Sequence, residues 1–287
     1  MGEVYRASVI AGPRKGSSVA LKRLAPSLAA HAEYVERFTT EADVCKLLDH
    51  PHIVKVLDVG VCQETYFIAM ELIDGTDLGR LLRRCRRAQI QLPVDFAVYL
   101  GKVLLDALAY AHGAVSASGA PLEIVHCDVS PSNLFISRMG EVKLGDFGVA
   151  RVRRWGGGEG DIAGKVHYLS PEAIEGQLTP AADLWAATVT LYELLTLQRP
   201  FSGPSNSAVI EAIQRRQYRP LRELRPELAG PLAAVVDRAL ALEPSARFSS
   251  ADELAQTLTG LFDERIGTPL AIAALVRGLF GKNPVKQ

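Results

Sequence analysis

A short stretch near the middle of the chain gathers residues suited to metal-assisted chemistry. Residues 126–133 read His-Cys-Asp-Val-Ser-Pro-Ser-Asn, and an Asp-Phe-Gly motif begins at Asp146, thirteen residues after Asn133. Carboxylate and amide oxygens are hard ligands of the kind that magnesium takes in proteins. Asp, Ser, Pro and Asn also form turns, so the octapeptide alone is open to a purely structural interpretation. The Asp-Phe-Gly motif downstream favours the chemical interpretation.

Further motifs stand on both sides of this stretch in a fixed order. Residues 19–22 read Val-Ala-Leu-Lys, and Glu41 follows Lys22 by nineteen residues. Residues 170–172 read Ser-Pro-Glu and residues 183–185 read Asp-Leu-Trp. A lone Lys–Glu pair at such a separation indicates only solvated surface, because exposed ion pairs are common and weak. Taken together, the motifs resemble those of the bacterial eukaryotic-like (Hanks-type) Ser/Thr protein kinases, from Gly2 to about Phe262.

The resemblance implies transfer of the γ-phosphate of ATP to a hydroxyl of a protein substrate, with Mg²⁺ as a cofactor. The transferred group carries heavy negative charge, so Asn133 and Asp146 are expected to hold magnesium against its oxygens. Asp128 is expected to face the incoming hydroxyl, orient it and accept its proton. Lys22 is expected to bind the α- and β-phosphates, and Glu41 is expected to hold Lys22 in position.

The same resemblance implies a nucleotide pocket. Val4, Ala20 and Phe135 are expected to enclose the adenine. Met70 is expected at the back of the pocket, and Glu71 to Ile73 are expected to form the hinge. Each of these residues taken alone indicates ordinary core or loop. The full expected nucleotide-binding set is Gly2, Val4, Ala20, Lys22, Met70, Glu71, Ile73, Asn133, Phe135 and Asp146.

Two structural pairings follow from the resemblance as well. Glu172, in the motif that closes the activation segment, is expected to pair with Arg247. Asp183, at the start of a central helix, is expected to hold the backbone of the catalytic loop.

The phosphate loop departs from the family pattern. The family has Gly-x-Gly-x-x-Gly-x-Val, of which only the third glycine, Gly2, and Val4 remain. The amides of this loop normally cover the phosphates, and its glycines allow the close approach. We therefore expect the gene to encode an in-frame Gly-x-Gly upstream of Met1.

Two other functions compete with a protein kinase. The shortened loop favours a catalytically silent pseudokinase that acts as a binding or scaffold module. The intact Lys22, Asp128, Asn133 and Asp146 favour an active enzyme instead. Phosphorylation of a small molecule is disfavoured by the Ser-Pro-Glu motif, because the segment before it forms a peptide-docking surface in the family.

Three substitutions change charge around the catalytic aspartate. Ser130 stands where the family has a lysine that reaches the γ-phosphate, and Lys165 stands where the family has a threonine. We expect Lys165 to supply this ammonium as a further catalytic residue, with Ser130 as its neutral partner. Cys127 replaces the arginine that grips a phosphorylated activation loop in relatives. From Gly148 to Leu169 the chain has no serine or threonine, so we expect no switch by Ser/Thr phosphorylation there.

The elements around these motifs predict a two-lobed α+β protein kinase fold. Residues 19–24, 53–59 and 66–72 have the pattern of strands, and residues 32–48 have helical spacing. Helices are expected at 96–112, 181–195, 207–215, 231–241 and 251–262. The predicted domains are a small lobe at 1–73 lacking most of its first strand, a large lobe at 74–263 and a tail at 264–287. The amphipathic part of the tail, from Pro269 to Phe280, could pack on the fold, bind another chain or be disordered.

Composition excludes several classes of partner. The 287 residues include 32 basic and 32 acidic side chains, so no bulk field favours nucleic acid. No apolar run reaches the roughly 20 residues that span a bilayer. The four scattered cysteines, at positions 45, 62, 85 and 127, predict reduced thiols and a cytoplasmic location. The arginine-rich run at 80–87 is expected to be solvated surface, with an acidic partner as the alternative.

Overall fold

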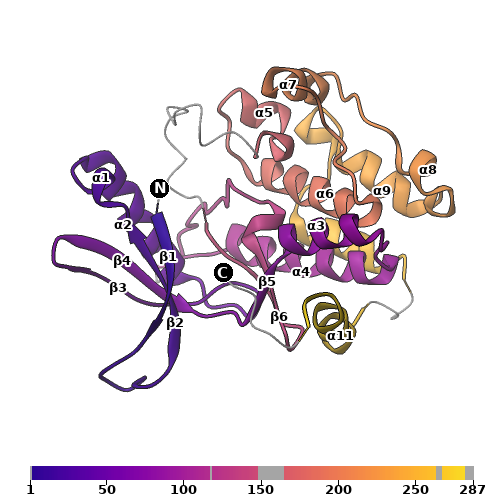
Figure 1. Ribbon diagram of the computed structural model, residues 1–287. Coiled ribbons are helices and arrows are strands. Elements are labelled where there is room, and N and C mark those ends of the chain that lie inside the picture. The colour runs from indigo at the N-terminus through magenta and orange to yellow at the C-terminus, as the bar shows by residue number, and fades with distance from the viewer. Residues whose placement is uncertain (1, 117, 148–164, 263–266, 282–287) are drawn as a thin grey trace.

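The chain forms two lobes joined by one short crossing segment in the computed structural model (Figure 1). The structure describes residues 2–116, 118–147, 165–262 and 267–281. A β-sheet with two helices forms the smaller lobe, and helices dominate the larger one. The predicted α+β architecture of two lobes is therefore confirmed. The exact limits of the three predicted domains stay predictions.

The small lobe is built on an antiparallel sheet with the strand order β1-β2-β4-β3. The strands are β1 (Gly2–Ser8), β2 (Ser18–Leu24), β3 (Val56–Cys62) and β4 (Thr65–Glu71). Helices α1 (Pro26–Ala29) and α2 (Ala32–Leu47) lie beside the sheet. Their common core consists of Leu24, Phe38, Ala42 and Ile68.

The strand expected at 53–59 begins later and ends later than predicted. Ile53 is buried and forms an isolated bridge to Leu144 in the large lobe, so it does not join the small sheet. The strand instead runs to Cys62, where Gln63 and Glu64 both have positive φ. Two such residues make the tight turn that suits the twist of a hairpin. Neither residue is a glycine or asparagine, so the sequence carried no turn signal here.

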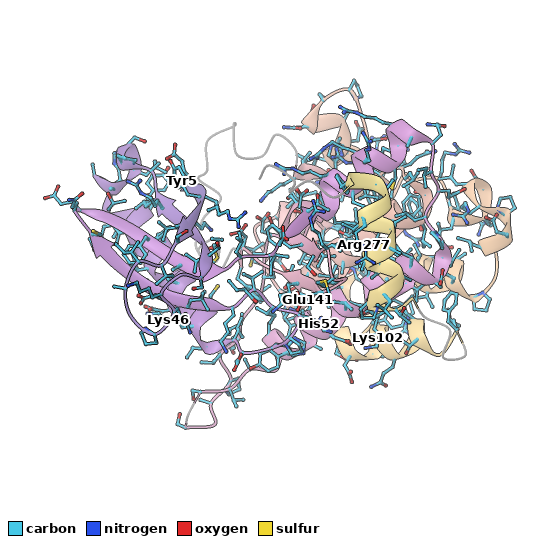
Figure 2. The ribbon with its side chains drawn as sticks, turned by 60° about the horizontal axis from the view of Figure 1, so that its bottom comes forward. Tyr5, Lys46, His52, Lys102, Glu141 and Arg277 are labelled. Atoms are coloured by element: carbon cyan, nitrogen blue, oxygen red, sulfur yellow. The ribbon has the colours of Figure 1, made fainter. Side chains whose placement is uncertain are left out.

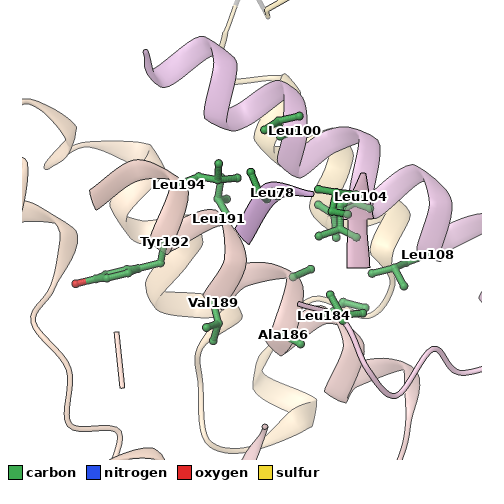
Figure 3. Packing of buried hydrophobic residues seen from close by; sticks show 14 of the residues in the cluster. Leu78, Leu100, Leu104, Leu108, Leu184, Ala186, Val189, Leu191, Tyr192 and Leu194 are labelled. Carbon is green, nitrogen blue, oxygen red and sulfur yellow. The ribbon is translucent and has the colours of Figure 1, made fainter. Parts of the chain in front are cut away.

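The large lobe is organised around two long helices, α4 (Val94–His112) and α6 (Pro180–Thr196). Leu100, Leu104 and Leu108 of α4 and Leu184 and Leu191 of α6 belong to one buried cluster (Figure 3). The other α-helices between residues 78 and 259 are α3 (Leu78–Ala88), α5 (Pro171–Ile174), α7 (Asn206–Gln214), α8 (Leu221–Leu224), α9 (Pro231–Ala239) and α10 (Ala251–Thr259).

Side-chain caps explain where several helices begin. Asp77, Ser170, Ser205 and Ser250 each accept a hydrogen bond from the backbone three residues on, at the starts of α3, α5, α7 and α10. Such caps each contribute about 1 kcal/mol to helix stability. The five predicted helices of this lobe are all present, and each end lies within three residues of its predicted position.

A small second sheet lies where the lobes meet. Its strands are β5 (Gly75–Asp77), β6 (Leu134–Ser137) and β7 (Val142–Leu144), in that order. The short helix η1 (Pro131–Asn133) precedes β6. Gly75 is required here, because a Cβ atom at this position would lie 1.9 Å from the carbonyl oxygen of Ile136. The sheet therefore ties the crossing segment to the end of the catalytic loop.

The C-terminal segment forms helix α11 (Pro269–Phe280) and packs on the large lobe. Ile272, Ala273 and Val276 are buried, and the helix contacts α3 and β6. Arg277, labelled in Figure 2, donates to the carbonyl oxygen of Arg138 at 3.2 Å. Of the three alternatives for the tail, packing on the fold is the one observed. Within the described ranges, none of the helices combines the length and apolar character needed to cross a bilayer.

Gly140 is expected to be essential for the packing of α11 on the large lobe. Its φ is +87°, and a Cβ atom there would lie 1.8 Å from the carbonyl oxygen of Pro269. A left-handed backbone costs an L-residue about 1–2 kcal/mol, and the clash adds to that cost. Gly140→Ala should therefore lower the free energy of unfolding and speed hydrogen exchange in α11.

Gly119→Ala is the matched control. Gly119 has a φ of +83°, but nothing lies within 4 Å of the place that a Cβ atom would occupy there. This variant measures the backbone cost alone. Equal losses of stability in both variants, with unchanged exchange in α11, would contradict the proposed role of Gly140.

Candidate active site

Lys22 lies between two carboxylates in the cleft. It comes from β2, and its Nζ lies 2.6 Å from Oε1 of Glu41 on α2 and 3.0 Å from Oδ1 of Asp146. Burial opposes the charge on Lys22, but Asp146 and Glu41 outweigh burial and raise its pKa above the ordinary value. Lys22 is therefore a fixed cation that links the sheet, the helix and the Asp-Phe-Gly motif.

The two carboxylates differ in their own titration. Burial raises the pKa of Glu41 despite the neighbouring ammonium. Burial also acts on Asp146, but there the attraction of Lys22 outweighs it and lowers the pKa. Asp146 is thus held ionised, as a metal ligand must be.

The Asp-Phe-Gly motif is held by packing behind the cleft. Phe147 is fully buried, with its ring centroid 4.5 Å from that of His126. His126 contacts the carbonyl oxygen of Gly145 at 3.1 Å, and burial lowers its pKa. Asp146 has a φ of +55°, a left-handed conformation that is uncommon for residues other than glycine. Such outliers persist where the surroundings over-determine them.

Asp128, Asn133 and Lys165 converge at the mouth of the cleft. The amide nitrogen of Asn133 donates to the carbonyl oxygen of Asp128 at 2.8 Å and to its Oδ2 at 3.0 Å. Lys165 Nζ also donates to Oδ2 of Asp128. Ser130 is buried and shares a hydrogen bond with Ser132 at 2.9 Å. The structure therefore brings Lys165 to the aspartate, although the two residues are far apart in the sequence.

Asp183 anchors the backbone of the loop that carries Asp128. Its Oδ1 accepts from the backbone nitrogen of Cys127 at 2.9 Å, and its Oδ2 accepts from that of His126 at 2.8 Å. His112 contacts the same Oδ2 at 2.8 Å. These bonds fix Cys127 at a φ of +62°. The predicted contact between Asp183 and the catalytic loop is confirmed.

The segment after residues 148–164, which lie outside the described ranges, is tied to the large lobe. Arg247 donates to both carboxylate oxygens of Glu172, at 2.6 and 2.8 Å, and both side chains are buried. This confirms the predicted pair. Tyr168 donates to Glu193 at 2.5 Å, and burial raises its pKa further above its ordinary value. The expectation that Ser/Thr phosphorylation does not switch residues 148–169 concerns mostly residues outside those described.

A pocket between the lobes is lined by seven of the ten residues expected to bind nucleotide, and Lys22 and Asn133 are not among its lining residues. Of the expected adenine and hinge residues, Val4, Ala20, Met70, Glu71, Ile73 and Phe135 line it, together with Asp146. The Glu71 carboxylate also contacts Lys143 at 2.7 Å and the backbone nitrogen of Lys55 at 2.8 Å. Gly2 begins β1, where it pairs with Leu24, and its part in nucleotide binding stays a prediction.

Several lining residues were not predicted. They are Val54, Thr76, Asp77, Arg80, Ser132 and Gly145. Val54 and Gly145 lie outside the sequence motifs. They line the pocket because they pack against each other, since a Cβ on Gly145 would lie 3.0 Å from a methyl carbon of Val54. Leu72 also lines the pocket, within the hinge expected from Glu71 to Ile73.

The donor set suits magnesium. Both hydrogen bonds that Asn133 makes to Asp128 use the amide nitrogen, which leaves the amide oxygen as the donor for a metal. Asp146 adds an ionised carboxylate. Among the described residues no three His, Cys, Asp or Glu side chains form a metal cluster. Magnesium commonly binds one or two protein oxygens plus substrate phosphates and water, so this sparse set fits it.

Comparison with known sequences gives consistent matches. The sequence profile of the protein kinase domain matches residues 1–258. The chain is 34% identical over 290 residues to the tyrosine-protein kinase MasK of Myxococcus xanthus, covering 98% of this chain and 44% of that protein. It is also 34% identical over 300 residues to a probable serine/threonine-protein kinase, SCO3848, of Streptomyces coelicolor, covering 100% of this chain and 42% of that protein. This chain thus spans less than half the length of these two relatives.

Solved structures agree with the sequence matches. The crystal structure of the PknI kinase domain of Mycobacterium tuberculosis superposes with a TM-score of 0.66 at 31% sequence identity. The match covers 91% of this chain and 90% of that domain.

Proposed function

Because this chain belongs to the protein kinase family, we propose that it transfers the γ-phosphate of ATP to serine or threonine hydroxyls of a protein substrate. The observation that carries the proposal is a set of linked contacts: Lys22 donates to Asp146 and Asn133 donates to Asp128. The backbone nitrogen of Gly145, the residue before Asp146, donates to the carbonyl oxygen of Asn133 at 2.9 Å and so joins the two pairs. Relatives named as a probable serine/threonine-protein kinase and a serine/threonine-protein kinase support this acceptor class, whereas MasK is named as a tyrosine-protein kinase. The reaction with ATP and the free cysteines support a cytoplasmic location.

Each residue has a distinct part in the proposed reaction. Lys22, fixed by Glu41, holds the α- and β-phosphates in register with the acceptor. Asn133 and Asp146 hold Mg²⁺, which neutralises charge on the phosphates when it is bound. Asp128 orients the acceptor hydroxyl and takes its proton, and Lys165 lies beside the same carboxylate.

The test is phosphoryl transfer from radiolabelled ATP with Mg²⁺ to peptides that differ only in a central serine, threonine or tyrosine. We expect the serine and threonine peptides to be labelled and the label to disappear in Asp146→Asn. Nucleotide binding, measured by fluorescence, should weaken in the same variant. Labelling of the tyrosine peptide alone would overturn the acceptor class. Tight nucleotide binding without transfer to any acceptor would favour the pseudokinase.

A further inference from the structure

Helix α3 carries a row of arginines on its solvent face. The row, here the arginine stripe, consists of Arg80, Arg83, Arg84 and Arg87. The buried residues of the same helix, Leu78, Leu81, Leu82 and Cys85, occupy the opposite face. Such a face alone is ordinary solvated surface. A functional interpretation therefore depends on where the stripe lies relative to the cleft.

The arginine stripe begins at the catalytic loop. Arg80 lines the cleft together with Ser132 and Asp146. A Cβ atom placed on Gly79 would lie 3.5 Å from Nη1 of Arg83 and 3.7 Å from the backbone nitrogen of Ser132. Helix α3 contacts η1, which contains Ser132. In Figure 1, α3 leads from β5 at the junction of the lobes into the large lobe. The stripe therefore runs outward from the place where an acceptor must enter.

Acidic side chains near the stripe are already engaged. Asp77 accepts from the backbone nitrogen of Arg80 at 2.8 Å and pairs with its guanidinium at 3.2 Å. Glu193 contacts Arg86, which lies outside the stripe. Among the described residues, neither Arg83 nor Arg87 has a carboxylate within 4.0 Å. The solvent face of α3 beside the cleft is thus basic in a chain whose formal net charge is zero.

We infer that the protein segment phosphorylated by this chain carries acidic side chains close to its acceptor residue, and that Arg83 and Arg87 recognise them. This inference rests on the proposed function. Guanidinium groups bind carboxylates with two charge-assisted hydrogen bonds. Exposed pairs of this kind each change affinity by up to about fivefold. They also steer encounter and set register, so two or more of them can select a substrate.

The test compares short peptides that share one central serine in a neutral background. The flanking positions are all aspartate, all alanine or all arginine, and each peptide carries a fluorescent label. Binding is measured by anisotropy at low and high salt, and phosphorylation is measured separately. We expect the aspartate peptide to bind tightest at low salt. In Arg83→Glu/Arg87→Glu its affinity should fall about tenfold, since two attractions become repulsions, while the preference should fade at high salt.

A control variant carries the same change of net charge elsewhere. Lys15→Glu/Lys46→Glu alters two exposed lysines of the small lobe, of which Lys46 is labelled in Figure 2. It should keep the preference for the aspartate peptide. Equal binding of the aspartate and alanine peptides, or an aspartate preference that survives in Arg83→Glu/Arg87→Glu, would overturn the inference. The binding measurements test the recognition of acidic peptides even if no peptide is phosphorylated. A lack of phosphorylation would count against the proposed function instead.

Discussion

Asp128→Asn is expected to lower the rate of phosphoryl transfer by about 10²–10⁴-fold, the range that a positioned acid–base group contributes. Asparagine keeps the shape of aspartate and can still accept a hydrogen bond from Asn133, which donates to Oδ2 at 3.0 Å in the native chain. It cannot accept the proton of the substrate hydroxyl. The loss should therefore appear in kcat, measured with saturating ATP and peptide, rather than in nucleotide affinity.

A matched control removes a carboxylate that also pairs with a lysine. Asp106 on α4 contacts Lys102, away from the pocket. Asp106→Asn should leave kcat and nucleotide affinity unchanged. If Asp128→Asn kept native kcat while its melting temperature and ATP affinity were also native, Asp128 would not be the base of this reaction.

The motifs predicted several contacts of the candidate site because each residue involved lies in a short, ordered segment of backbone. Lys22 contacts Asp146 and Asn133 contacts Asp128, and the predicted contacts of Asp183 and Arg247 are present. Hydrogen bonds from a loop backbone to a buried aspartate depend on few residues, so a local pattern is sufficient to indicate them.

Features created by packing between distant segments were harder to predict. Val54 enters the pocket because its backbone nitrogen donates to the carbonyl oxygen of Leu144 at 2.8 Å, a contact between the lobes. The same join removes Ile53 from the strand expected to contain it. The burial of one face of α11 depends on Gly140 and on α3 and β6 together. No local pattern in the sequence predicts such contacts between distant segments.

The left-handed backbone at the site is another feature that residue types do not reveal. Cys127 and Asp146 have φ values of +62° and +55°; Cys127 immediately precedes Asp128, and Asp146 is itself a residue of the site. Cysteine has no special tolerance for this conformation, so hydrogen bonds from the surrounding structure must compensate its cost. Asp183 supplies one such bond, by accepting from the backbone nitrogen of Cys127 at 2.9 Å.

The second large effect on kcat is expected at Lys165. Ser130 stands where the family has a lysine, and Lys165 stands where the family has a threonine. Lys165→Ala should reduce kcat by about 10²-fold, the loss typical for removing one group that stabilises transition-state charge. The reason is geometric. Lys165 Nζ contacts the carboxylate of Asp128, so its ammonium lies where the acceptor and the γ-phosphate must meet. Nucleotide affinity should change less, because Lys22 and Asp146 remain.

A rescue variant separates this electrostatic role from a merely structural one. Ser130→Lys in the Lys165→Ala background returns one ammonium to the neighbourhood of Asp128, now from position 130, where the family has its lysine. The Ser130→Lys single variant controls for disturbance of the buried hydrogen bond between Ser130 and Ser132. We expect the double variant to recover a substantial part of the lost kcat, with the ATP affinity of the native chain.

If Lys165→Ala left transfer rates unchanged while Asp128→Ala abolished them, the exchange of residue types between positions 130 and 165 would have no catalytic meaning. A loss that Ser130→Lys does not repair, accompanied by a lowered melting temperature, would instead assign Lys165 to the stability of the substrate-docking segment.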